Sequence, residues 1–306
     1  MKIGLLIIFL GLIFSQDIPS FDAKRAMDLL EIQCAFGPRY PGSLGHQHMK
    51  KFMENFLNPL SDSLYIMDEE IPHPYQKRTL HLTNYLARYN IEALYRIMLM
   101  AHWDTREFAD QELDPKNQKL PVIGANDGAS GVAVLLVLAE ILHTLPPLNI
   151  GIDILFVDGE DQGRIGDTKN FGLGTQAFAK HVPYPLPQFA ICLDMVADHE
   201  QHFPIEHFSL QYAPEVVQAI WTLANDLGYT QFENRMGHAI MDDHYYLYNY
   251  AKIPAIDIID FDYPNSEVNY WHTLKDIPEN CSTESLESIG TVMTHFIYRQ
   301  DEGYRP

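Results

Sequence analysis

The sequence predicts an α/β fold, a single three-layer α/β/α domain around a mixed, largely parallel central sheet. Short apolar, β-branched runs alternate with helical patterns, which is typical of parallel sheets covered by helices on both faces. The 306 residues, 46% of them hydrophobic, can bury one substantial core and are too few for several large domains. No internal repeat, low-complexity tract or linker divides the chain. We therefore expect one globular domain.

The elements follow from these runs. Four strands are predicted, at residues 93–102, 150–157, 189–196 and 253–260. Four helices are predicted, at residues 131–145, 171–181, 214–228 and 285–300, the last with Ser282 or Thr283 as its cap. The turn-rich stretch 107–121 lies between structured segments, so it is interpreted as a loop within the domain.

Residues 1–15 are typical of a secretory signal peptide, which leaves 16–306 as the mature domain. A single Lys2 precedes an apolar run from Ile3 to Phe14, and the small Ser15 follows. The run is shorter than the roughly 20 residues that span a bilayer, so an uncleaved anchor is the lesser alternative. No Cys lies there to accept a lipid. We expect a secreted or periplasmic protein without stable membrane insertion after cleavage.

Charge and cysteine content exclude several classes of protein. The formal net charge of −20, from 21 basic and 41 acidic residues, argues against binding nucleic acid or an anionic membrane surface. Three cysteines are too few for a disulfide-built scaffold. Cys192 lies in an apolar run and is expected to be buried, whereas a bridge between Cys34 and Cys281 stays open.

Polar side chains gather where the predicted strands end. Ligands of open α/β sheets bind outside the carboxyl ends of the strands. A single polar residue at a strand end can be explained by the strand emerging into water. Polar residues at the ends of several strands favour a common site. Its members are His102, Asp158, Glu160, Asp161, Asp194 and Asp257.

Carboxylates and imidazoles at these ends suit a divalent metal, and catalytic zinc usually takes three protein ligands. The candidates are His102 in AHWD, Asp127 in GANDGASG, Glu160 and Asp161 in DGED, Asp194 in CLDMV, and His272 in YWHTLKD. Two of them have structural alternatives, because Asp127 could cap a helix and His272 could be a surface imidazole. At the end of a buried strand, adjacent Glu160 and Asp161 repel each other unless a cation neutralises one.

The ordered motifs AHWD, GANDGASG, LFVDGED, CLDMV, DDH and YWHTLKD resemble those of the family-28 zinc aminopeptidases. Within that superfamily they are most similar to the glutaminyl-peptide cyclotransferases, or glutaminyl cyclases. The similarity spans residues 30–300. The cyclase branch is favoured by FGPRYPGSLGHQHMKKFM at 36–53, by the Trp before His272, and by DDHYYLYNYAKIPAIDI at 242–258.

The resemblance implies one zinc per chain, bound by Asp127, Asp161 and His272. It implies that Glu160 is the general acid/base and that Asp194 and Asp242 hold protons beside it. The substrates would be peptides with an N-terminal glutamine, which is cyclised to pyroglutamate with release of ammonia. Trp271 is the first candidate for a pocket wall, and Trp103 and the tyrosines within 245–250 are weaker candidates.

The chain also departs from the animal cyclases. Asp161 stands where they have Glu, Asp257 stands where they have His, and their tryptophan shortly after the two acids is not evident. These differences resemble bacterial cyclases.

Two other hypotheses remain. His102 and Asp194 match positions that hold a second zinc in the aminopeptidases, where Glu160 would activate water instead. A secreted binding protein without activity is the weakest hypothesis, because all the proposed ligands and the base are present.

Overall fold

The computed structural model describes residues 18–164 and 166–304, so the predicted signal peptide lies outside the described residues. Within that part of the chain, no helix has both the length and the apolar character that crossing a membrane requires.

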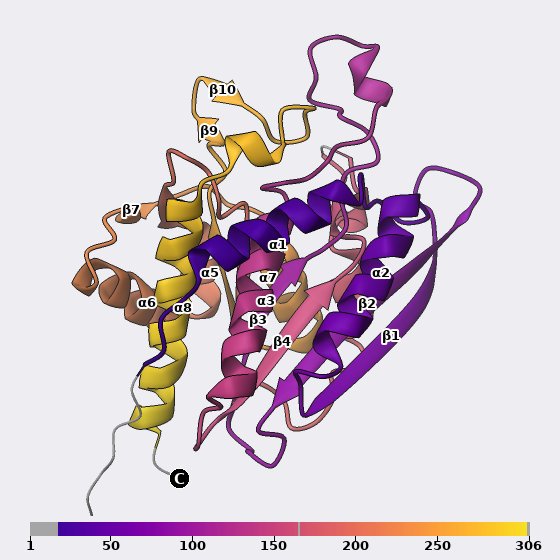
Figure 1. Cartoon of the computed structure of the whole chain (residues 1–306). Coiled ribbons are helices and arrows are strands. Elements are labelled where there is room, and N and C mark those ends of the chain that lie inside the picture. The colour runs from indigo at the N-terminus through magenta and orange to yellow at the C-terminus, as the bar shows by residue number, and fades with distance from the viewer. Residues whose placement is uncertain (1–17, 165, 305–306) are drawn as a thin grey trace, which may run out of the picture.

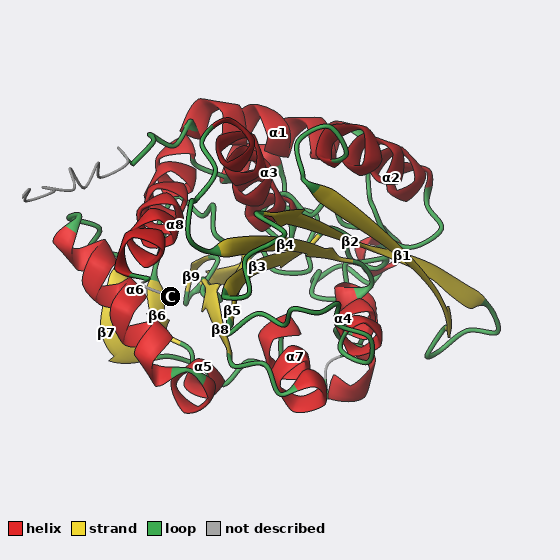
Figure 2. Ribbon diagram, turned by 90° about the horizontal axis from the view of Figure 1, so that it is seen from below, coloured by secondary structure: helices red, strands yellow, loops and turns green. Residues whose placement is uncertain are grey.

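A six-stranded sheet forms the centre of the molecule (Figure 1), and its strands lie in the order β1-β2-β4-β3-β5-β8 (Figure 2). Its strands are β1 (Ser63–Pro72), β2 (Thr79–Tyr89), β3 (Arg96–His102), β4 (Gly151–Val157), β5 (Ala190–Asp194) and β8 (Ala255–Ile259). The strands β4, β3, β5 and β8 run parallel, whereas β1 and β2 form an antiparallel hairpin that joins β4 at one side. The predicted mixed, largely parallel sheet is confirmed.

Helices cover both faces of this sheet, as Figure 2 shows. One face carries α1 (Ala23–Ala35), α2 (Leu44–Leu57), α3 (Ala129–Thr144) and α8 (Thr283–Gly303). The other face carries α4 (Leu173–Phe178) and α7 (Asp243–Ala251). This arrangement confirms the predicted three layers.

Smaller elements complete the fold. Beside the β8 edge lie β6 (Phe203–Ile205), α5 (His207–Tyr212), α6 (Pro214–Asp226) and β7 (Phe232–Met236). A short hairpin is formed by β9 (Pro264–Asn265) and β10 (Val268–Asn269). Single 3-10 turns are η1 (Asn117–Lys119), η2 (Glu160–Gln162), η3 (Thr168–Asn170) and η4 (Pro278–Asn280).

The central strand β3 shows why the sequence has continuous apolar runs. Ile97 and Leu99 pack into the core beneath α1, α3 and α8, whereas Met98 and Met100 pack into the core on the opposite face. All four side chains are fully buried. Because successive residues of a strand point to opposite faces, a strand with helices on both sides needs apolar residues throughout.

The predicted strands and helices are all present, with shorter or shifted bounds. The largest difference is the helix predicted at 171–181, which spans only Leu173–Phe178. The cap of α8 is Ser282, whose hydroxyl accepts from Ser285 N. Several elements were not predicted from the sequence, namely α1, α2, β1, β2, α5, α7 and the short strands β6, β7, β9 and β10.

All three cysteines are free and buried. Cys192 is a buried core residue, as predicted. The Cys34 to Cys281 bridge that the sequence left open does not form, although both thiols lie in the same apolar core.

Candidate metal centre and active site

The candidate site lies where the parallel strands end. His102 is the last residue of β3 and Asp194 the last of β5, whereas Glu160 and Asp161 form the turn η2 that directly follows β4. The remaining candidates come from loops and a helix start, with Asp127 before α3, Asp242 at the cap of α7, and Trp271 and His272 after β10. The carboxyl ends of parallel strands meet at one sheet edge, which brings these segments together.

The turn after β4 separates a structural acid from two site acids. Asp158 accepts from His46 Nε2 and from Thr83 N, each at 2.8 Å, so it ties α2 and β2 to the end of β4. Gly159 follows with φ +71, and a Cβ there would lie 2.7 Å from Leu82. This left-handed glycine turns the chain, and Glu160 comes next.

Asp104 holds the two site acids in place. Its carboxylate accepts from Glu160 N at 3.0 Å, from Asp161 N at 3.3 Å and from Gln162 Nε2 at 3.2 Å. The same carboxylate lies 3.6 Å from His102 Nδ1. Asp104 therefore connects the end of β3 to the turn η2.

Asp127, Asp161 and His272, the sequence-derived ligand set, lie together. Their candidate donor atoms are within 4.8 Å of one another, and all three residues are buried. His272 Nε2 is 3.0 Å from Asp161 Oδ1 and 3.7 Å from Asp127 Oδ2. Asp161 Oδ2 is buried without a hydrogen-bond partner. Two carboxylates and one imidazole with an unpaired buried oxygen fit a zinc ion.

The backbone fixes two of these residues. Asp276 accepts from Asn126 N at 2.7 Å and from Asp127 N at 3.3 Å, which anchors the loop before α3. The cap of α3 is Gly128, so Asp127 is not the helix cap that the sequence allowed as an alternative. His272 is buried and has φ +56, a costly conformation for a residue with a side chain.

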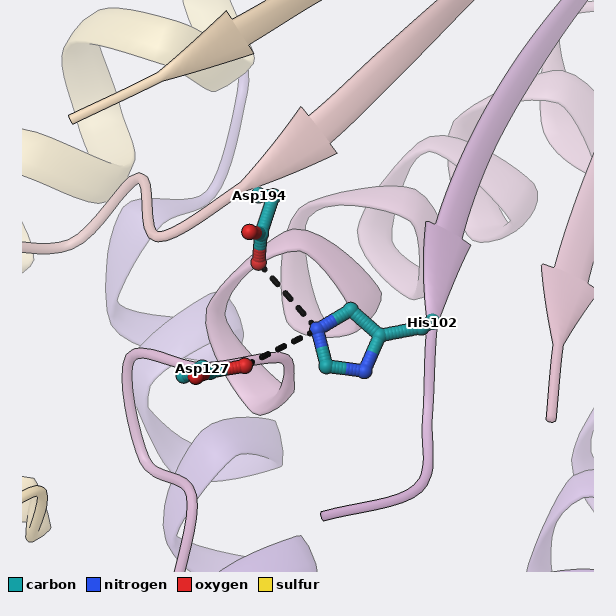
Figure 3. Close-up of side chains that lie close together, drawn as sticks. All are labelled: His102, Asp127 and Asp194. Atoms are coloured by element: carbon teal, nitrogen blue, oxygen red, sulfur yellow. Dashed lines mark hydrogen bonds and ion pairs between the residues drawn. The ribbon is translucent and has the colours of Figure 1, made fainter. Parts of the chain in front are cut away.

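His102, Asp127 and Asp194 form a second buried cluster (Figure 3). His102 Nε2 is 3.0 Å from Asp127 Oδ1 and 3.2 Å from Asp194 Oδ1. A Cβ on Gly128 would lie 2.5 Å from His102 Nε2, so glycine permits this close approach. Asp127 belongs to both clusters, with one oxygen near each imidazole.

Buried charges shift the pKa values of these groups. Burial lowers the pKa of His102, but the surrounding carboxylates Asp104, Asp127 and Asp194 raise it well above its ordinary value. The direction of this shift favours the protonated form of the imidazole that lies between Asp127 and Asp194. Burial raises the pKa of Asp194 to about 7.

Glu160 is buried beside the two clusters. Burial, and then the negative charge of Asp242, raise the pKa of Glu160 well above the ordinary value of a carboxyl group. Asp242 in turn accepts a hydrogen bond from the Cys192 thiol at 3.2 Å. A carboxyl group with a raised pKa can exchange protons near neutral pH, which is what a general acid/base requires.

A cavity of about 390 Å³ opens above these acids. Asp127, Glu160, Asp194, Asp242 and His272 line it. Its apolar walls are formed by Phe171, Ile240, Met241, Ile259, Phe261 and Trp271. The Trp271 ring stacks on His272, with ring centroids 3.7 Å apart. An apolar cavity with a few convergent polar groups is the usual form of a small-molecule site.

Three weaker sequence candidates lie elsewhere. Trp103 is fully buried and stacks on His46 in the core, so it does not form the pocket wall. The tyrosines within 245–250 are also absent from the cavity lining. Asp257 lies within β8, where it is fully buried 3.7 Å from His244 Nδ1, and not at the cavity. The prediction that Asp257 lies at the rim of the site is wrong, because β8 continues past it to Ile259.

Sequence reasoning missed Asp104, Arg106 and Asp110, which contact the site acids and His272. A signal was present, because all three follow His102 within the same strand-to-loop segment. Asp104 ends the motif AHWD, Asp110 lies in the stretch 107–121 that was interpreted as a loop, and Arg106 stands between them, but none of the three was considered a site residue.

Comparison with known proteins agrees with this geometry. A sequence profile of Peptidase family M28 matches residues 84–297. The glutaminyl cyclase of Tannerella forsythia is 36% identical, with a TM-score of 0.87, over 92% of this chain and 99% of that chain. A Zn-dependent exopeptidase from Parabacteroides distasonis is 35% identical with the same TM-score and the same coverage. The mouse glutaminyl-peptide cyclotransferase-like protein is 23% identical over 85% of this chain and 71% of that protein.

The profile match covers more than half of the chain, and it includes all six motifs from which the resemblance was inferred, from AHWD to YWHTLKD. The chain belongs to Peptidase family M28.

Proposed function

We propose that this protein is a zinc-dependent glutaminyl-peptide cyclotransferase, an acyltransferase that converts the N-terminal glutamine of peptides to pyroglutamate and releases ammonia. The observation that carries the proposal is Glu160, a buried carboxyl with a raised pKa at an apolar cavity beside the candidate ligands. The similarity to glutaminyl cyclases, at 36% identity over nearly the whole chain, supports the same function.

The residues of the cavity have separate roles in this reaction. Asp127, Asp161 and His272 would hold the zinc, which when bound supplies a Lewis acid for the carboxamide oxygen. Glu160 takes a proton from the α-amine as that nitrogen bonds to the carboxamide carbon. It then returns the proton to the departing nitrogen, which leaves as ammonia.

Three further residues assist. Asp194 and Asp242 line the cavity together with Glu160, and the negative charge of Asp242 helps to keep the pKa of Glu160 high. Trp271 offers an aromatic wall for the aliphatic part of the glutamine side chain.

An aminopeptidase is the alternative, and one observation favours it. Asp127 has one oxygen near His102 and the other near His272, so it could bridge two ions. Against this, the resemblance to the glutaminyl cyclases implies a single ion, held by Asp127, Asp161 and His272. We therefore propose one zinc per chain. The expectations of export through residues 1–15 and of a secreted or periplasmic location also belong to this proposal.

The test measures metal content and products on the purified enzyme. We expect one zinc per chain, pyroglutamate and ammonia from a glutaminyl peptide, and negligible hydrolysis of leucyl or alanyl amides. His102→Ala should keep its zinc and lose only part of its activity, whereas His272→Ala should lose the metal. Two zincs per chain, with leucyl-amide hydrolysis that disappears in His102→Ala, would instead establish the aminopeptidase.

A further inference from the structure

Two residues outside the ligand set connect Asp161 to His272. Arg106 Nη1 donates to Asp161 Oδ1 at 3.2 Å and to the Asp161 carbonyl at 3.0 Å. Arg106 Nη2 donates to Asp110 Oδ2 at 2.6 Å, and Asp110 Oδ1 lies 3.2 Å from His272 Nδ1. Because His272 Nε2 is 3.0 Å from Asp161 Oδ1, the four side chains form a closed ring.

We propose that Arg106 and Asp110 are positioning residues of the metal centre, which orient Asp161 and His272 and thereby set the affinity for zinc. The inference rests on the ligand set proposed above. It deepens that proposal, because neither residue is itself a ligand.

Asp110 acts on the tautomer of His272. Asp110 Oδ1 faces Nδ1, so an imidazole that donates its Nδ1–H to this carboxylate keeps the lone pair on Nε2. Nε2 is the nitrogen that faces Asp127 and Asp161. A carboxylate behind a ligating histidine also makes the imidazole a better donor, and losing it typically weakens metal binding about 10- to 100-fold.

Arg106 acts on Asp161. Its guanidinium is buried, and its planar fork holds the Asp161 and Asp110 carboxylates at fixed positions. It occupies Asp161 Oδ1 and leaves Oδ2 without a partner. Arg106 also lies 5.6 Å from the Phe171 ring, which lines the cavity, so the same side chain supports the cavity wall.

The test uses Asp110→Asn and Arg106→Lys in the full-length enzyme. Zinc dissociation constants are measured by competition with a chromophoric chelator, independently of activity. We expect each variant to bind zinc about 10- to 100-fold more weakly. Enzyme activity should recover in large part when zinc is saturating. Nitrogen-15 chemical shifts of His272 in the zinc-loaded enzyme should show a fixed Nδ1–H in the wild type and loss of that preference in Asp110→Asn.

Matched controls separate positioning from folding. Arg164→Lys and Asp167→Asn change the same residue types nearby, at side chains that contact Tyr75 and no candidate ligand. Both should keep wild-type zinc affinity, and all four metal-free proteins should melt at similar temperatures. If Asp110→Asn and Arg106→Lys bind zinc as tightly as these controls, the inference is wrong. If His272→Ala retains zinc, the proposed ligand set itself fails, which is a separate result.

Discussion

The adjacent residues Glu160 and Asp161 have opposite electrostatic environments. Burial raises the pKa of both carboxyls, but the positive charges of His272 and Arg106 hold the pKa of Asp161 well below its ordinary value. For Glu160, burial and the negative charge of Asp242 outweigh the opposing effect of His102, so its pKa stays high. One residue therefore remains an anion suited to binding a cation, while its neighbour can carry a proton.

Changing Glu160 to Gln tests this division. The variant keeps the size of the side chain and removes the proton acceptor, but it removes no candidate ligand. We expect zinc to stay bound while kcat falls by about 10²- to 10⁴-fold, the usual contribution of a general base. Steady-state kinetics and metal analysis of the same preparation give both quantities.

The matched control is Glu267→Gln, in the exposed turn between β9 and β10, which should retain full activity. Near wild-type turnover in Glu160→Gln would exclude Glu160 as the acid/base. Loss of zinc in that variant would show that Glu160 is a ligand.

At the scale of elements, Glu206 joins the segment β6 to α5 with the helix α7. Its buried carboxylate caps α5 by accepting from Phe208 N and Ser209 N, and it also accepts from Ile240 N. The carboxylate lies 3.0 Å from His244 Nε2 in α7. Although burial raises the pKa of Glu206, these partners, His244 first, lower it to about 2. The ionised form therefore holds the Ile240–Met241 side of the cavity to the rest of the domain.

This pKa predicts how stability depends on pH. A carboxyl whose folded pKa is below its unfolded value of about 4.3 stabilises the fold fully above that value. The contribution is lost as the pH falls from about 4.3 toward 2. We expect Glu206→Gln to lower the free energy of unfolding at neutral pH by about 3 kcal/mol. The difference from wild type should shrink in acid.

Urea unfolding of wild type and variant between neutral pH and the acid limit of folding measures this difference. Glu215→Gln, an exposed acid in the first turn of the neighbouring helix α6, is the control and should change stability by less than about 0.5 kcal/mol. If the difference in the free energy of unfolding between wild type and Glu206→Gln stays constant with pH, the ionised Glu206 is not what stabilises this cap.

At the scale of the whole molecule, the acids of the site oppose folding unless they are neutralised. Asp127, Asp161, Asp194 and Glu160 are buried at the end of one sheet, and each carries a cost of desolvation. In the metal-free protein, His102, His272 and Arg106 lie against these acids and compensate part of their charge. A bound metal ion should supply more, so metal binding and folding are coupled.

Removing the metal should therefore lower the melting temperature. At a metal concentration about 1,000-fold above Kd the stabilisation is roughly 4 kcal/mol, which corresponds to a shift on the order of 10 °C. Scanning calorimetry with and without a zinc chelator measures it, and added zinc should restore the original value. Glu160→Gln should show the same shift and Asp127→Ala should show none. An unchanged melting temperature after complete removal of zinc would contradict the coupling.

The sequence by itself determined the α/β class and the central parallel strands. Core strands covered on both faces need continuous apolar runs, as β3 and β4 show, and such runs are visible without a structure. The edge hairpin of β1 and β2 was missed because β1 is half-exposed and its pattern is mixed. The short helix α7 was missed because its sequence, DHYYLYNYA, lacks a clear apolar stripe.

For the site, the sequence and the family resemblance supplied the candidates Asp127, Glu160, Asp161 and His272. Only the tertiary structure showed which other side chains contact these candidates and orient them. Asp110 meets His272 across 162 positions, and Arg106 meets Asp161 across 55. The sequence pattern shows which residues of an element face the core and which face solvent. Contacts between distant segments depend on how those elements pack. The connection from Arg106 through Asp110 to His272 therefore forms only when β3, β4 and the loop after β10 meet at one edge of the sheet.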